Sequence, residues 1–281
     1  IQQLYNFAPG PLSYWDFEEG QGTAASDRSG NGLTGTLTSG PTWTQGKYGK
    51  SVNFDGSDDH ILTANTDLTY LSTSFTMSAW VKATNDSTIK SVVRAATTGR
   101  DVAFVINWTS LDAAAANKAT CGGYSGTTWT GQYVIGTSNV NDGNWHYIAC
   151  TMNNSKVVKV YVDGKLENQG TLGSLPASPG SVPVYIGRYP NSSVELFKGP
   201  IDEVRTYNYE RSAGQIVEDM NAGHPPPGSP IGSPISYWKL DQGYGTTANN
   251  SISGQPNFTL TASPNDPAWT QSGKFGKALD F

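Results

Sequence analysis

In many stretches of this chain, every second residue belongs to one set of side chains and the residues between them belong to another. Residues 145–152 and residues 75–82 both change character at every position, which is the period of a β-strand with one face in a core. Residues 157–162 run into Asp163-Gly164, and Asp-Gly between two strand patterns predicts a hairpin because both central residues take positive φ. Residues 102–108, 182–189 and 201–207 follow the same pattern. The pattern predicts an all-β chain of many short strands arranged as a two-sheet sandwich.

One short helix is predicted after these strands, over residues 212–223. Ser212 is a candidate N-cap and Gln215 follows three residues later, which is the spacing of a capping box. Gly223 provides a stop signal, and Pro225 to Pro227 cannot continue a helix.

The opening segment of the chain recurs near its end. Residues 13–23, SYWDFEEGQGT, return at 236–246 as SYWKLDQGYGT, and residues 41–54 return at 267–271 and 273–281. An internal repeat of this length indicates one complete unit followed by the start of another.

The repeat and the composition predict five segments. Residues 1–11 are the tail of a preceding unit or a linker, and 12–211 are the complete sandwich. The helix at 212–223 is followed by a Pro/Gly/Ser linker at 224–235, and 236–281 are a partial second repeat. A partial repeat cannot bury its own apolar face, so we expect inter-unit packing by Trp238, Leu240, Trp269 and Phe281. Because the chain starts at Ile1 and not at Met, we expect a mature product or a segment of something longer.

The composition narrows the classes of partner. Charged residues make up 15% of the chain and the net charge is −5, which disfavours nucleic acid because phosphate binding needs clustered Lys and Arg. No apolar run has the length of about 18 residues that crossing a membrane requires. The Asn-x-Ser/Thr sequons begin at Asn85, Asn107, Asn153, Asn191, Asn249 and Asn257.

These motifs resemble a known family. The order YWDFEEGQGT, SGNG, FDGSDD, SFTMSAWVK, DGNWHY, VYVDGK, GPIDEVRTYN is similar to that of laminin-G-like, concanavalin-A-like jelly rolls in bacterial surface and secreted proteins. The resemblance covers nearly the whole chain. It implies an antiparallel jelly roll, an extracellular or cell-surface location, and tandem units in which a helix leads into the next repeat.

The resemblance also implies a calcium site where the first and last strands meet. Calcium takes about six to eight oxygen ligands. The matching positions here are Asp16 or Glu18 in the opening strand, the turn from Asp27 to Asn31, and Asp202 in the last strand. The alternative is that Asp27 and Asn31 cap turns by Asx hydrogen bonds, and that Asp202 or Glu203 pairs with Arg205.

Glycan binding would need aromatic rings displayed beside polar groups. Trp80 and Trp108 on strands and Tyr124 and Trp129 on loops are the candidates, with core packing as the alternative. Cys121 and Cys150 are expected to form a disulfide in an extracellular setting, although two buried thiols would also satisfy the sequence.

No catalytic constellation is visible, because no strand carries the paired carboxylates of a glucanase and no His lies beside a nucleophile motif. The predicted function is therefore a non-catalytic structural or adhesive repeat packed on neighbouring copies of itself. A calcium-dependent lectin-like module is the second prediction, and an accessory region of a secreted hydrolase or pilin-like protein is the third.

Overall fold

The computed structural model describes residues 9–64, 66–67, 71, 73–97, 100–125, 132–174, 180–190, 194–222, 237–238, 240, 242–250, 256–260, 267–271 and 277–280. The chain divides into two compact units, Ile1–Gly223 and His224–Phe281. They are called unit 1 and unit 2 below and are described separately.

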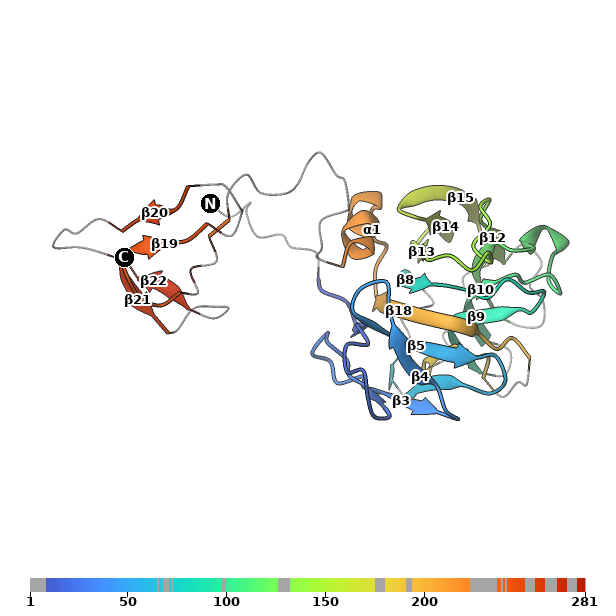
Figure 1. The fold of residues 1–281 in the computed structure, drawn as a ribbon. Helices are drawn as coiled ribbons and strands as arrows, with labels where there is room; N and C mark the ends of the chain where they lie inside the picture. The colour runs from blue at the N-terminus through green and yellow to red at the C-terminus, as the bar shows by residue number, and fades with distance from the viewer. Residues whose placement is uncertain are drawn as a thin grey trace. The chain divides into compact units, whose positions relative to one another are not determined.

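The first large sheet of unit 1 has the strand order β15-β14-β13-β8-β18-β5-β4, and β1 also pairs with β18 (Figure 1). All of its pairings are antiparallel. Its strands are β1 (Ser13–Trp15), β4 (Thr42–Gln45), β5 (Lys50–Asp55), β8 (Phe75–Val81), β13 (His146–Met152), β14 (Val157–Val162), β15 (Lys165–Thr171) and β18 (Lys198–Tyr207).

The second large sheet has the order β12-β11-β10-β9-β17-β6-β3-β2 and is also antiparallel. Its strands are β2 (Ala24–Ala25), β3 (Gly35–Thr38), β6 (His60–Thr63), β9 (Lys90–Thr97), β10 (Arg100–Ile106), β11 (Ala119–Ser125), β12 (Tyr133–Ile135) and β17 (Tyr185–Ile186). A small pair, β7 (Thr66–Asp67) with β16 (Ser181–Val182), and a 3₁₀ turn at Ala113–Ala115 complete the strands and loops.

One continuous apolar core includes residues from both sheets. Met77 and Ile148 of the first sheet and Val102 and Phe104 of the second belong to it, each at most 2% exposed. The predicted two-sheet antiparallel sandwich is confirmed. The hairpin turn is confirmed as well, because Asp163 and Gly164 have φ of 49° and 78°.

Cys121 on β11 and Cys150 on β13 form a disulfide, with Cα atoms 6.0 Å apart. The bridge joins the two sheets through the core, and both residues are at most 1% exposed. The predicted pairing is confirmed in preference to two free thiols.

Helix α1 (Ala213–Met220) follows β18 and begins as the sequence predicts. The Ser212 side chain accepts from the Gln215 backbone N–H, and the Gln215 side chain accepts from the Ser212 N–H, which completes the capping box. Across the part of the chain that the structure describes, no helix has the length and apolar character needed to cross a membrane.

Unit 2 contains β19 (Thr247–Ala248) paired with β20 (Phe258–Thr259), and β21 (Ala268–Thr270) paired with β22 (Ala278–Asp280). Its hydrogen bonds repeat those of the start of unit 1. Trp43 Nε1 donates to Gly22 O at 2.8 Å, and Trp269 Nε1 donates to Gly245 O at the same distance. The Tyr14 N–H donates to Asp27, as the Tyr237 N–H does to Asn250. The sequence repeat is thus also a repeat of local structure.

Candidate functional site

Trp80 lies beneath helix α1 and is 6% exposed. Its ring packs with Tyr147 and Ile216, and its Nε1 donates to the Met220 carbonyl at 2.8 Å. The expectation that Trp80 offers a face to a glycan is not met by this arrangement, because a helix from the end of unit 1 covers the ring.

Trp108 is likewise buried, at 4% exposure, and packs against Ala103, Val105 and Ala115 on the outer face of the second sheet. It lies two residues beyond β10, so its placement on a strand is wrong. Tyr124 was expected on a loop, but its backbone belongs to β11; its side chain lies outside the described part of the structure. Trp129 and Phe281 lie outside the described residues.

Among the candidate calcium ligands, Asp202 on β18 is the one whose carboxyl pKa is shifted most. It is fully buried, and its Oδ2 accepts the Tyr48 backbone N–H at 3.0 Å. Its Oδ1 is buried with no hydrogen-bond partner. The pKa of the Asp202 carboxyl is raised to about 8, chiefly by burial and also by the adjacent Glu203, while hydrogen bonds from backbone N–H groups oppose the shift.

Glu18 approaches the same turn as Asp202. It accepts the Lys50 backbone N–H at 3.0 Å, and Gly49 lies directly against its carboxylate. A Cβ on Gly46 would stand 2.7 Å from Asp202 Oδ2. Residues 46–49, between β4 and β5, therefore lie against two carboxylates from different parts of the chain.

The other three candidate ligands have partners elsewhere. Asp16 pairs with Arg28 at 3.0 Å, and the Asn31 side chain donates to Leu12 O at 2.9 Å. Both oxygens of Asp27 accept hydrogen bonds, from the N–H groups of Tyr14, Ser29 and Leu33 and from the Ser29 hydroxyl. This is the Asx-capped turn that the sequence allowed as an alternative. Glu203 pairs with Arg205 at 2.5 Å, as that alternative also foresaw.

Of the five candidate calcium ligands, Asp202 and Glu18 are the two that lie against the turn between β4 and β5. A buried carboxylate oxygen without a partner is costly, and a cation would satisfy it. Asp202 and Glu18 could hold such an ion. Within the described residues, three acidic side chains gather only at Asp55, Asp58 and Asp59, where the Asp59 side chain accepts the Asp55 N–H and closes the turn.

A cleft of about 420 Å³ opens in unit 1 between the loop that joins β8 to β9 and the loop that joins β10 to β11. We call it the amide cleft. It is lined by Asn85, Asp86, Ser87, Asn107, Thr109, Ala116 and Asn117.

Buried polar contacts hold the walls of the amide cleft in place. Lys90 is fully buried on β9, and its Nζ donates to Asp86 at 2.6 Å. Asn141 Nδ2 donates to Asp86 O at 2.7 Å and to Asn117 Oδ1 at 3.0 Å. The Asn117 N–H in turn donates to Asn107 Oδ1 at 2.8 Å. The loops are therefore cross-linked, and Asn85 and Thr109 remain exposed at the cleft.

Sequence reasoning did not identify this cleft. One of its loops precedes β9 and the other follows β10, and the antiparallel pairing of these two strands brings the loops together. The sequons at Asn85 and Asn107 are the one sequence signal that fell on it.

A second polar cluster lies on the outer face of the second sheet. Arg94 is 2% exposed and binds Asp101 through two nitrogens, at 2.6 and 3.0 Å, and it also pairs with Glu195. Tyr189 stacks on its guanidinium at 3.9 Å. Both carboxylates are engaged by the arginine.

Two antiparallel sheets with a shared core and loops that form a polar cleft define a lectin-like jelly-roll sandwich. A laminin-G family model, described as the concanavalin A-like lectin/glucanases superfamily, matches residues 55–217. The chain belongs to this superfamily, which confirms the resemblance seen in the sequence. No curated protein matches the chain in sequence.

Solved structures with the same fold include the binding domains of several toxins and one domain of an arabinanase. The binding domain of Paraclostridial Mosquitocidal Protein 1 is 14% identical with a TM-score of 0.59, over 76% of this chain and 52% of that one. Domain 4 of AbnA, a GH43 extracellular arabinanase from Geobacillus stearothermophilus solved with arabinotriose, is 19% identical with a TM-score of 0.56, over 74% and 97%. The binding domain of botulinum neurotoxin serotype D is 13% identical with a TM-score of 0.58, over 77% and 52%. This chain thus spans about half the length of the toxin domains that it matches. At these identities the likeness concerns the fold.

Proposed function

We propose that this chain is a non-catalytic, extracellular, lectin-like module that binds glycans in the amide cleft. The observation that carries the proposal is the cleft itself, where residues with amide, hydroxyl and carboxylate side chains line one hollow. A primary amide both donates and accepts hydrogen bonds, which matches the hydroxyl groups of a sugar. Superfamily membership and the arabinotriose-bound domain with the same fold support this choice.

This proposal places glycan binding ahead of the structural array that the sequence favoured. Trp80 and Trp108 are not part of it, because both rings are buried. The described lining of the amide cleft contains no aromatic ring. We therefore expect binding through hydrogen bonds, with modest affinity in the range of about 10⁻³ to 10⁻⁵ M.

A glycan array followed by calorimetric titration of the best hit tests the proposal. Asn85→Ala and Thr109→Val each remove an exposed polar group of the cleft without removing one of the contacts that hold its walls, and each should weaken binding at least about threefold. Asn208→Ala, an exposed asparagine elsewhere on unit 1, is the matched control and should bind normally. Absence of any glycan hit, or hits that both cleft variants retain at full affinity, would refute the proposal.

Calcium has a supporting role in the proposal. Asp202 and Glu18 would hold the ion at the turn between β4 and β5, where its charge would satisfy the buried Asp202 oxygen and fix this turn against the sandwich. The expected contribution is to stability, because these residues are not part of the amide cleft.

A second candidate function is the structural tandem array, in which units pack on neighbouring copies. The observation in its favour is that unit 2 repeats the hydrogen bonds of the opening segment of unit 1. Electron microscopy of native material with and without a chelator tests it. Regular filaments or beaded strings would support the array, whereas separate globules under both conditions would rule it out.

A further inference from the structure

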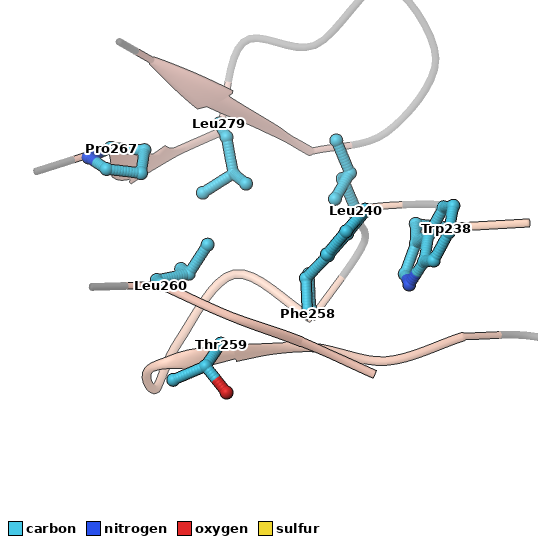
Figure 2. A pocket seen from close by; sticks show the side chains of 8 residues that line it. Trp238, Leu240, Phe258, Thr259, Leu260, Pro267 and Leu279 are labelled. Atoms are coloured by element: carbon cyan, nitrogen blue, oxygen red, sulfur yellow. The ribbon is translucent and has the colours of Figure 1, made fainter. Parts of the chain in front are cut away.

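Unit 2 presents an apolar hollow of about 530 Å³. Figure 2 shows Leu279, Leu260, Leu240 and Phe258 arranged around this open space. The hollow is lined by Trp238, Leu240, Ala248, Phe258, Thr259, Leu260, Pro267 and Leu279. An exposed apolar face of this kind marks a surface that associates with another.

Unit 1 shows which strands cover the corresponding face. The repeat aligns Trp238 with Trp15, Leu279 with Val52 and Leu260 with Leu37. In unit 1 these three residues are at most 7% exposed. In the first sheet β18 is the neighbouring strand, where Ile201 pairs with Val52 and Val204 with Trp15. In the second sheet β6 is the neighbouring strand, where Ile61 pairs with Leu37.

One residue of this apolar face differs between unit 1 and unit 2, and the difference limits which strand can pack against the face of unit 2. Gly35 of β3 has no side chain, and a Cβ there would stand 2.5 Å from Cγ2 of Ile61. The matching residue of unit 2 is Phe258, because Ala25 pairs with Gly35 and Ala248 pairs with Phe258 in the same register. Phe258 is 54% exposed and stacks on Trp238, with ring centroids 4.0 Å apart.

Phe258 therefore carries a side chain at the position where, in unit 1, any Cβ would meet Ile61. A strand identical to β6 would bring a branched side chain into Phe258, and close-packed cores do not absorb such an overlap. A strand with a small residue at that point would meet no obstacle.

We propose that the apolar face of unit 2 is the docking site for a laminin-G-type closing segment, which pairs a β18-like strand with β22 and a β6-like strand with β20. The β6-like strand carries a small residue, such as Gly or Ala, where β6 carries Ile61. The inference concerns unit 2 and is independent of glycan binding by unit 1.

The test extends the full chain at Phe281 with a second copy of residues 55–222, since Phe281 matches Phe54. Four forms are compared: the unmodified extension, Phe258→Gly, Ile61→Ala in the appended copy alone, and both changes together. Hydrogen exchange at Ala278–Asp280 and Phe258–Thr259 reports strand pairing, and binding of an apolar dye reports the open face. The cooperative unfolding of unit 1 serves as the internal folding control.

Either single change should slow exchange at these strands about tenfold or more and abolish dye binding, because it removes the overlap. The unmodified extension should remain open, and the double change should protect less than either single change because it leaves a void. Tyr244→Ser, an exposed aromatic position outside the hollow, should behave as the unmodified extension.

Three results would overturn the proposal. If hydrogen exchange is slowed equally in the unmodified extension, the claim that Phe258 selects a small residue is wrong. If exchange is slowed in none of the forms, the claim that a closing segment docks on this face is wrong. A concentration-dependent dimer of the unextended chain, lost in Leu279→Asp, would show that a second copy covers the face.

Discussion

Asp202 combines full burial, one unpartnered oxygen and a pKa raised to about 8. In the metal-free protein the folded state therefore holds a proton that the unfolded state releases at its ordinary pKa near 3.8. The folded pKa is the higher one, so this group stabilises the fold fully below about pH 4, and the contribution is lost as the pH rises toward 8.

Replacing this carboxyl with a neutral amide should remove that dependence. In chelator, the free energy of unfolding of the wild type should fall relative to that of Asp202→Asn between pH 4 and 8, with a slope of at most about 1.4 kcal/mol per pH unit. Urea titrations across this range provide the measurement. Calcium at neutral pH should raise the melting temperature of the wild type and leave that of Asp202→Asn unchanged. If the unfolding free energies of the wild type and Asp202→Asn change in parallel with pH in chelator, the raised pKa of Asp202 is contradicted.

At the scale of elements, helix α1 is attached to the outer face of the first sheet by polar groups as well as by the apolar side chains of Ile216 and Met220. Asp219 binds Arg211 at 2.6 Å and accepts the Tyr207 hydroxyl at 2.9 Å, while its carbonyl accepts from Arg205 at 3.0 Å. The Met220 carbonyl accepts from Trp80 and Tyr48. The helix therefore depends on a buried ionic network more than on its own length.

Asp219→Ala should cost about 3–5 kcal/mol of unfolding free energy, because it leaves the buried Arg211 without its carboxylate. Glu218→Ala is the adjacent control. Its side chain is 75% exposed and lies 4.0 Å from Arg211, so the change should cost less than about 0.5 kcal/mol. Urea denaturation of both variants decides the matter, and equal losses would contradict the role given to Asp219.

The Cys121–Cys150 bridge is a covalent cross-link between the two sheets. Its sequence separation is 29, for which loop-closure entropy predicts a stabilisation of about 3–4 kcal/mol. Cys121→Ala/Cys150→Ala should lose that amount by urea denaturation, and reduction of the wild type should produce a comparable loss. An unfolding midpoint insensitive to both treatments would show that packing alone holds the sheets together.

Local signals in the sequence predicted the hairpin, the capping box and the strand pattern, because each depends on residues a few positions apart. The environment of Trp80 could not be read in this way. Alternation marks two faces of a strand, but it does not say that residues 213–220 will return to cover one of them. Asp16, Asp27 and Asn31 are similar cases, since their partners are set by how the opening turn closes.

At the scale of the whole molecule, the fold places the amide cleft on unit 1 and a separate open face on unit 2. Of the residues expected to pack between units, Trp238 and Leu240 line the hollow of unit 2 and Trp269 does not, and the packing itself stays a prediction. The amide cleft needed the structure, because the order of β9, β10 and β11 brings its loops together.

The central claim is glycan binding at the amide cleft, and NMR titration of the full chain with the best array hit tests it most directly. The side-chain NH₂ signals of Asn85 and Asn117 should shift in a saturable way, while that of Asn208 stays in place. Saturable shifts confined to other residues, or no shift at any glycan concentration up to about 10 mM, would contradict the account.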